Sequence, residues 1–471
     1  MRKNIATASL LTVAVLLGGC TLAPDYKRPD LAVPATLPEA PSNLEGATGE
    51  DGRAVAEIGW QEFFTDERLK GVIELALANN RDLRIAAANV ERARALYRVE
   101  RSSLFPSLSA DGTMTEQRPG GTAAQLYGGA TIENWSASLG AAWEIDLFGR
   151  IRSLSDAALE QFFAVEQNRN AARISLIAET ASVWLTLSAD RQRLATAEQT
   201  LEAFGKTLEL VRALHEKGTA SGIDVRQAQT SYDQARSDVA TLRTQVAQDL
   251  NALALLAGTT VPETLLPEQG NEAPATLTAL PVGVSSEVLL RRPDVAAAEH
   301  QLMAANANIG AARAAFFPRI SLTGMFGTMS NAFSGLFDAG TKTWSYTPAV
   351  SLPLFSGGRN VANLKASEAQ RDAAVANYER AVQTAFREVA DALARRATID
   401  EQLSAQQSLE KTASELLRLS EARYRLGADS FLATLDAQRT HFAAQQSLIA
   451  TRLARDVNLV DLYRSLGGGL K

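Results

Sequence analysis

The sequence has little of the chemistry that enzymes, metal sites and disulfide-bonded proteins use. Its 471 residues include a single cysteine, so no intramolecular disulfide can form. The three histidines, His215, His300 and His441, are scattered over the chain. No phosphate-binding loop, Gly-x-Ser-x-Gly motif or metal-ligand spacing is present. These absences predict a protein that is not an enzyme and that needs no cofactor or metal.

Two further absences exclude common partners. The net charge is −6, and no cluster of Lys and Arg is interleaved with aromatic residues, so nucleic acid is not an expected partner. Beyond the N-terminus, no unbroken apolar run reaches the roughly 20 residues that a transmembrane helix needs. Any insertion into a membrane must therefore use something other than an apolar helix.

The N-terminus has the features of an export signal. Arg2 and Lys3 precede an apolar run that ends in Leu17-Gly18-Gly19-Cys20, which predicts a signal peptide over 1–19. The lone thiol of Cys20 in this position resembles the bacterial lipoprotein cleavage box, in which the cysteine becomes the first residue and carries lipid such as palmitate. Gly18 departs from the more usual Ala or Ser, and the alternative is an unmodified cysteine. Residues 20–66 are rich in Pro, Gly and acidic residues, with Trp60 as the first hydrophobic anchor, and we expect a lipid-anchored tether with little regular structure.

The chain is organised around a strand followed by a very long helix. From Trp135 to Leu147 apolar residues alternate with polar or small ones, which is the pattern of a β-strand. Residues 149–217 then contain no proline and little glycine, so they predict one helix of roughly 100 Å. Leu187, Leu194, Leu201 and Leu208 recur every seven residues, which indicates coiled-coil packing.

The whole pattern occurs twice. Phe317-Pro318 follows Phe105-Pro106 by 212 positions, whereas Trp344 follows Trp135 and Gly427 follows Gly218 by 209. The helices at 67–104 and 221–257 together match one long helix, so we expect them to stack end to end. The predicted parts are a first repeat at 67–257 (helix, hairpin 107–147, long helix 149–217, helix 221–257), a linker at 258–284, a second repeat at 285–466 (helix, hairpin 319–355, long helix 357–426, helix 430–466) and a tail at 467–471.

The strands predict an oligomer. One chain supplies four strands, whereas outer-membrane barrels have about eight or more. Open strand edges leave backbone groups without hydrogen-bond partners in lipid, so several chains must combine their strands. Two chains would give eight strands and three would give twelve, and the periodicity does not choose between these numbers.

Several motifs resemble the outer-membrane efflux protein family, in its lipidated TolC/OprM-like branch. They are Leu-Phe-Gly-Arg at 147–150, Leu-Phe-Ser-Gly-Gly-Arg at 354–359, the two Phe-Pro helix stops, Tyr-Arg-Leu-Gly at 424–427 and Leu-Asp-Ala-Gln at 435–438. The resemblance implies a mainly α fold with a transmembrane β portion, forming a homotrimer with a twelve-stranded barrel and a twelve-helix tunnel. It also implies an outer-membrane duct that reaches into the periplasm, and two partners, a periplasmic adaptor and an inner-membrane transporter of the RND type.

The resemblance also nominates a gate at the free end of the helices. Asp436 matches aspartates that ring the pore in the family, and Leu432 matches an apolar constriction one turn earlier. The alternatives are an Asp436 paired with Arg439 at i+3 and a Leu432 in the coiled-coil core. Gln227 stands where the first repeat would carry Asp436, so a ring would hold three acids and not six.

Five tip residues match positions where family members lock helices together or meet the adaptor: Gly218, Tyr424, Arg425, Gly427 and Asp429. The alternatives are structural. The glycines can end helices in a left-handed conformation, and the two side chains Tyr424 and Arg425 can simply be surface residues. Asp429 and Ser430 are placed to cap the last helix, as Ser221 and Asp224 are in the first repeat.

The resulting hypothesis is a passive, gated duct that exports small toxic compounds as part of a tripartite efflux system. The same duct could serve metal-ion efflux or type I polypeptide secretion. A coiled-coil structural lipoprotein or adhesin is the rival from another class, although a spacer does not need the alternating strands. A lipid-anchored periplasmic enzyme would need a concave site with convergent titratable groups, which the sequence does not indicate.

Overall fold

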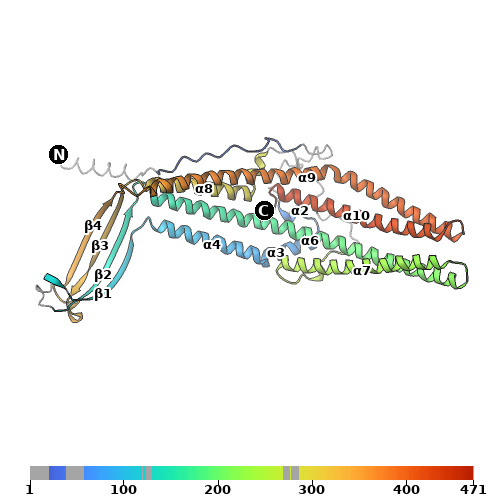
Figure 1. Ribbon diagram of the computed structural model, residues 1–471, viewed down its shortest axis with the longest axis horizontal. Helices are drawn as coiled ribbons and strands as arrows, with labels where there is room; N and C mark the ends of the chain where they lie inside the picture. Colours follow the sequence, from blue (N-terminus) through green and yellow to red (C-terminus); the bar gives the residue numbers. More distant parts are fainter. Residues whose placement is uncertain are drawn as a thin grey trace. The chain divides into compact units, whose positions relative to one another are not determined.

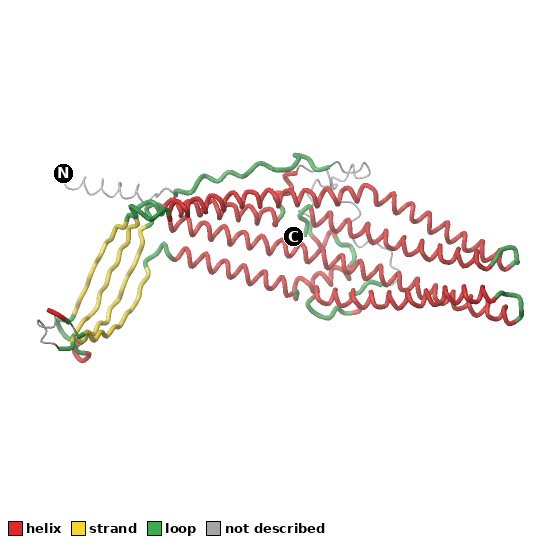
Figure 2. Tube along the Cα trace, in the orientation of Figure 1, coloured by secondary structure: helices red, strands yellow, loops and turns green. Residues whose placement is uncertain are grey.

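The fold consists of long helices and one four-stranded sheet (Figure 1, Figure 2). A computed structural model describes residues 21–38, 58–118, 120–122, 130–268, 276 and 286–469. The signal peptide 1–19 and Cys20 lie outside the described residues. The elements are α2 (Trp60–Phe63), α3 (Glu67–Asn79), α4 (Arg81–Ser102), β1 (Ser107–Gln117), β2 (Ile132–Ile145), α6 (Arg150–Glu216), α7 (Gly222–Ala257), η3 (Glu263–Leu265), η4 (Ser286–Arg291), α8 (Pro293–Ala314), β3 (Arg319–Ser330), η5 (Phe333–Gly335), β4 (Lys342–Ser351), α9 (Arg359–Arg425) and α10 (Phe431–Ser465).

The two long helices, α6 and α9, have 67 residues each. Both end at a glycine with positive φ, which is 77° at Gly218 and 72° at Gly427. The next amide reaches back to a carbonyl five residues earlier, 2.9 Å away at both Thr219 and Ala428. This is the geometry of a Schellman cap, in which glycine adopts the left-handed conformation without a Cβ penalty. The structural role that the sequence offered for these two glycines is therefore present.

The sheet is antiparallel with the strand order β1-β2-β3-β4. Met114 faces Trp135 in the first hairpin, and Phe326 faces Trp344 in the second. Most of the large apolar residues, such as Trp135, Leu139, Phe326 and Trp344, share one face, whereas Ser136 and Ser138 share the other with Met325 and Met329. A sheet with one mainly apolar face follows directly from the alternation in the sequence.

The chain forms two compact units that cut across the sequence repeats. The sheet unit comprises the chain up to Asp30 with Asn89–Glu166 and Ala297–Glu379. The hairpin unit comprises Leu31–Ala88, Gln167–Ala296 and Arg380–Lys471. Each unit contains the corresponding parts of both repeats, because α6 and α9 each contribute residues to both units. The repeats are thus units of sequence and not of packing.

The helix predicted over 67–104 is wrong in its continuity, because it is broken at Asn80. The Asn80 Oδ1 accepts a hydrogen bond from the Leu83 amide (2.9 Å), and its Nδ2 donates to the Leu256 carbonyl at the end of α7 (3.0 Å). The buried side chain therefore ends α3, starts α4 and holds the end of α7. The end of α7 therefore meets the first repeat at this break, inside the predicted helix, and not at the start of that helix as the expected stacking of 67–104 on 221–257 required.

The second repeat has the same junction, built by a different residue. Arg292 lies 212 positions after Asn80 and is also buried. Its guanidinium donates to the Ser465 carbonyl (2.9 Å) and pairs with Asp294 (2.7 Å) and Glu388 (2.8 Å). In place of one continuous helix, the short η4 precedes α8 here.

The tether prediction is wrong for part of the N-terminal segment. Residues 21–30 have no regular structure, as expected, but they are bound along α8 in the sheet unit. Arg28 donates two hydrogen bonds to the buried carboxylate of Glu299 (2.7 and 3.0 Å), and Tyr26 donates a third (3.0 Å). A Cβ on Gly310 would lie 2.7 Å from the Ala23 nitrogen, so glycine permits the close approach. We call residues 21–30 the N-terminal strap.

The second half of the tether contains a helix and part of the core. Trp60 and Phe63 of α2 are buried in the hairpin unit. The Phe63 ring stacks on Tyr463 with centroids 4.0 Å apart, and the Tyr463 hydroxyl donates to the Ile58 carbonyl (2.7 Å). Trp60 is thus an anchor, as predicted, but it anchors a folded segment.

Candidate gate and contact surface at the hairpin tips

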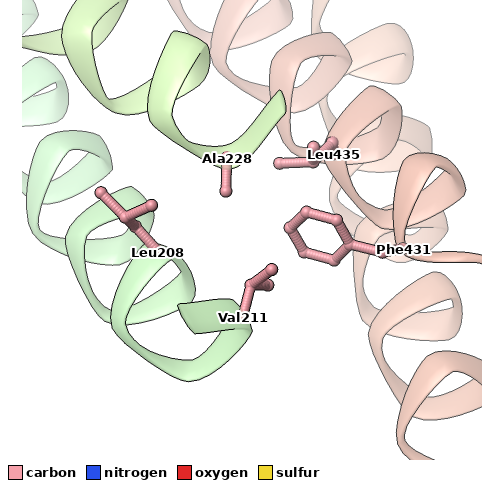
Figure 3. Packing of buried hydrophobic residues seen from close by; sticks show 5 residues of the cluster. All are labelled: Leu208, Val211, Ala228, Phe431 and Leu435. Atoms are coloured by element: carbon pink, nitrogen blue, oxygen red, sulfur yellow. The ribbon is translucent and has the colours of Figure 1, made fainter. Parts of the chain in front are cut away.

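The two helical hairpins of the hairpin unit share one apolar cluster near their turns (Figure 3). Figure 3 shows Leu208 and Val211 of α6 and Ala228 of α7 close to Phe431 and Leu435 of α10. Full burial of a Leu or Phe side chain contributes about 1.5–3 kcal/mol. The cluster therefore holds the α6–α7 and α9–α10 hairpins together close to the predicted gate.

Tyr424 is the tip residue that joins this cluster. It packs at the edge of the cluster, with its ring 5.6 Å from that of Phe431 at an interplanar angle of 52°. Burial, and the nearby charge of Asp224 on the other hairpin, raise the pKa of the Tyr424 phenol. Tyr424 is therefore a packing residue within the single chain as well as a candidate for contacts at the tip.

Leu432 and Asp436 lie together on the outer face of α10. Phe431 and Leu435 are buried in the cluster, whereas Leu432 is 44% exposed. Asp436 follows Leu432 by four residues, so the two side chains share one helix face. The alternative of a Leu432 in the coiled-coil core does not hold within this chain. Both candidate gate residues face away from the cluster and are open to other groups.

Asp436 also lies near Arg439 of the same helix, the partner that the alternative to a gate role predicts. Its carboxylate lies 3.9 Å from an Arg439 guanidinium nitrogen, and the Asp436 side chain is 64% exposed. Arg439 donates a shorter bond of 2.9 Å to the Ser231 hydroxyl on α7. A long, exposed ion pair of this kind contributes little to stability. The carboxylate therefore stays available for interactions outside the chain.

Asp429 does not cap the last helix, and that prediction is wrong. The Asp429 carboxylate accepts two hydrogen bonds from Arg423 (2.6 and 2.9 Å), and this guanidinium lowers the pKa of Asp429. Ser430 occupies the N-cap position, but its side chain makes no capping bond. The bidentate charged pair across the glycine turn displaces the cap, because such pairs are stronger than neutral ones.

The first tip has the cap that the sequence predicts. The Ser221 hydroxyl accepts from the Asp224 amide (3.2 Å), and the Ser221 amide donates to the Asp224 carboxylate (2.8 Å). This is a complete capping box with Asp in place of Glu. The two tips therefore have the same turn but different polar chemistry.

The remaining tip candidates are open to solvent. The Arg425 side chain is 75% exposed, and its guanidinium lies 3.5 Å from Glu421 one turn earlier. A Cβ on Gly218 or Gly427 would meet no atom within 4 Å. Both turns thus present uncovered surface on which a second protein could pack.

Sequence reasoning missed Ile223, the counterpart of Leu432 in the first repeat. Ile223 is 69% exposed on the first turn of α7. The offset of 209 that pairs Gly218 with Gly427 also pairs Ile223 with Leu432, so the repeat contained the signal. Apolar side chains are therefore exposed at equivalent places on both hairpins.

Each of the three histidines contacts a carboxylate or a backbone carbonyl in the described part of the chain. No three His, Cys, Asp or Glu side chains come together there as a metal site requires. His300 contacts Glu160 (2.7 Å), His441 contacts Glu410 (3.2 Å), and His215 contacts the Ala220 carbonyl (2.9 Å). Within the same residues, no helix combines the length and apolar character needed to cross a membrane.

The comparisons with known proteins agree with the class that this arrangement suggests, an outer-membrane channel. Residues 72–259 and 284–468 match the family model of the outer membrane efflux protein. The chain is 45% identical over 467 residues to the toluene efflux pump outer membrane protein TtgC and to the antibiotic efflux pump outer membrane protein ArpC, both of Pseudomonas putida. Each alignment covers 98% of this chain and 96% of the relative.

A solved structure supports the same conclusion. The open state of the MtrE outer membrane channel of Neisseria gonorrhoeae has a TM-score of 0.83 and 38% identity, over 96% of this chain and 99% of that chain. The chain therefore belongs to the outer membrane efflux protein family. It is a bacterial outer-membrane efflux protein with the predicted fold class, and its family is one of channels and not of enzymes.

Proposed function

We propose that three copies of this chain form one duct through the outer membrane. The observation that carries this proposal is a four-stranded amphipathic sheet whose outer strands, β1 and β4, each have a free edge in the described chain. Such edges are unstable in lipid, and a four-stranded sheet cannot close on itself. Three copies would supply twelve strands, in line with the family resemblance, and the long helices would continue the passage into the periplasm.

The cargo that fits best is a range of small toxic compounds. The relatives named for toluene and antibiotic efflux are 45% identical over almost the whole chain, which supports solvents and drugs as cargo. The duct would be passive, because it has no energy-converting motif. A periplasmic adaptor at the exposed tips and an inner-membrane transporter of the RND type would supply the driving force. Metal-ion efflux and type I secretion remain alternatives that a transport assay separates.

Lipid on Cys20 would add a second attachment to the membrane. Cys20 is the residue directly before Thr21, which contacts the buried Ser153 of α6 through its hydroxyl (3.3 Å). The N-terminal strap would then connect the lipid to the sheet unit through Glu299 and its partners. Mass spectrometry of the N-terminal peptide tests this, and a free thiol at Cys20 would exclude the modification.

We further propose that Asp436 and Leu432 form the gate. In a three-fold assembly, one exposed carboxylate and one exposed leucine from each copy would surround the axis. Three such carboxylates would attract cations, and three leucines would narrow the passage. Tyr424, Arg425 and Asp429, together with the turns at Gly218 and Gly427, would form the adjoining lock or adaptor contact.

Single-channel recording in a planar bilayer tests the duct and its gate. The purified protein should conduct, and Asp436→Ala should increase the leak current and weaken the preference for cations. Asp233→Ala, an exposed aspartate elsewhere on α7, is the matched control and should leave the currents unchanged. Silence under all gating conditions would favour a structural lipoprotein, and unaltered currents in Asp436→Ala would remove this residue from the gate. Deleting the gene and measuring which compounds accumulate would identify the cargo.

A further inference from the structure

The internal repeat makes it possible to infer how the outer strands β4 and β1 would pair between two copies of the chain. Within the chain, β2 of the first repeat pairs with β3 of the second. In a ring of copies, β4 of one copy would meet β1 of the next, which is the same junction between a second and a first repeat. We propose that this contact between copies reproduces the register of the β2–β3 pair. The inference rests on the proposed oligomer and adds the residues that meet in it.

The two hairpins define how positions transfer between repeats. Met114 faces Trp135 in the first hairpin, and Phe326 faces Trp344 in the second. β1 therefore maps onto β3 with an offset of 212, and β2 maps onto β4 with an offset of 209. These are also the offsets of the sequence repeat. Each position of β1 or β2 therefore has one equivalent in β3 or β4, without an insertion or deletion along the paired strands.

Applying these offsets to the inner junction gives the contact between copies. Ala141 faces Gly324 within the chain, and the equivalent positions are Val350 and Gly112. Ala137 faces Thr328, and the equivalent positions are Tyr346 and Glu116. Val350 of one copy therefore lies opposite Gly112 of the next, and β4 residues 345–351 lie antiparallel to β1 residues 117–111.

The faces of the strands agree with this register. Val350 and Tyr346 lie on the apolar face of β4, and Gly112 lies with Met114 on the apolar face of β1. A slip of one residue would place the apolar side chains of one strand beside the polar face of the other. An added Cβ on Gly112 would meet no atom within 4 Å, so the place opposite Val350 is free. The apolar surface becomes continuous across the contact around Val350 and Gly112, while Glu116 stands opposite Tyr346 near the end of β1.

An aromatic pair beside the sheet gives a separate comparison, which rests on shared motifs because Phe355 follows Phe148 by 207 positions and not by 209. Phe148 stacks on Phe317 within the chain, with centroids 4.9 Å apart and an interplanar angle of 23°. In the repeated Leu-Phe and Phe-Pro motifs, their counterparts are Phe355 and Phe105. Phe355 is 92% exposed and Phe105 is 63% exposed in the single chain. These two rings are placed to pack against each other between neighbouring copies.

Paired cysteines in the full-length protein, oxidised in outer-membrane vesicles, test the register. Gly112→Cys with Val350→Cys should give covalent multimers up to three copies. The internal equivalent, Ala141→Cys with Gly324→Cys, should cross-link within one chain. Glu116→Cys with Val350→Cys displaces one thiol by four residues, roughly 13 Å along the strand, and should not react. Val350→Cys alone controls for any contribution from Cys20.

The outcomes separate the contact from the proposed function. Cross-linking of the displaced pair in place of the matched pair would overturn the register, as would failure of the internal pair on which the transfer is based. A trimer that persists on native gels without a cross-link at Gly112 and Val350 would overturn the inference and leave the trimeric duct standing. A monomer on those gels would refute both.

Discussion

Replacing Gly258 with alanine should open the junction between α7 and the α3–α4 break. Gly258 has φ = 66°, and a Cβ placed on it would lie 2.5 Å from the Asn79 carbonyl oxygen and 2.8 Å from the carbonyl carbon. The left-handed conformation alone costs alanine about 1–2 kcal/mol. The neighbours are backbone atoms, which cannot turn aside as a side chain can, so overpacking adds roughly 1–3 kcal/mol.

The chain offers a control that isolates the second contribution. Gly218 also has a left-handed φ of 77°, but a Cβ there would meet no atom within 4 Å. Gly218→Ala should therefore lose only the conformational part, about 1–2 kcal/mol. The difference between the two variants measures how tightly the end of α7 packs on Asn79.

Hydrogen exchange of individual amides is the suitable assay, because it reports local opening without global unfolding. The amide of Leu83 donates to Asn80, whose own side chain binds the Leu256 carbonyl. Since about 1.4 kcal/mol is a tenfold change in an equilibrium constant, Leu83 should exchange roughly ten times faster or more in Gly258→Ala. Gly218→Ala should leave this amide unchanged. Equal protection of Leu83 in the two variants would refute the packing argument.

Three further predictions concern the half-buried Asp249, the N-terminal strap and the gate. Burial and the neighbouring Asp190 raise the pKa of Asp249 from 3.8 to about 6, so the folded state holds this proton more tightly and loses stability as the pH rises between these values. Asp249→Asn should therefore raise the melting temperature at pH 8 and leave it unchanged near pH 3; an equal gain at both would contradict this origin. Glu299→Gln removes the charge that holds Arg28, so trypsin should cut the N-terminal strap faster, whereas the exposed Glu67→Gln should have no such effect. Ile223→Ser combined with Leu432→Ser should raise the leak current above that of Leu432→Ser alone, and equal currents would place Ile223 outside the gate.

Much of the fold could be predicted because it depends on local patterns. The alternation from Trp135 onward predicted β2, and the absence of proline after Gly149 predicted α6 to within one residue at each end. The offsets of 212 and 209 predicted an internal repeat, and the strand pairs of the two hairpins have these offsets. Such features are decided by neighbouring residues and by period, so a sequence shows them directly.

The candidate site was less predictable, because its contacts join residues across turns and between helices. The capping box of Ser221 and Asp224 is local and was predicted correctly. Asp429 precedes Ser430, which looks like the start of another capped helix, but Arg423 binds the Asp429 carboxylate across the turn. No local sequence pattern indicates this pairing. The gate roles of Asp436 and Leu432 stay predictions, since they require several copies of the chain.

The sequence by itself determined the strands, the long helices, the repeat and the family, since each is written in the order and spacing of residue types. Only the tertiary structure decided where the first helix breaks, since Asn80 is held by a carbonyl 176 residues away. It also decided that the N-terminal strap binds α8 through Glu299, 271 residues from Arg28. The physical reason is the same in both cases: a buried polar group must find a hydrogen-bond partner, and that partner can come from anywhere in the chain.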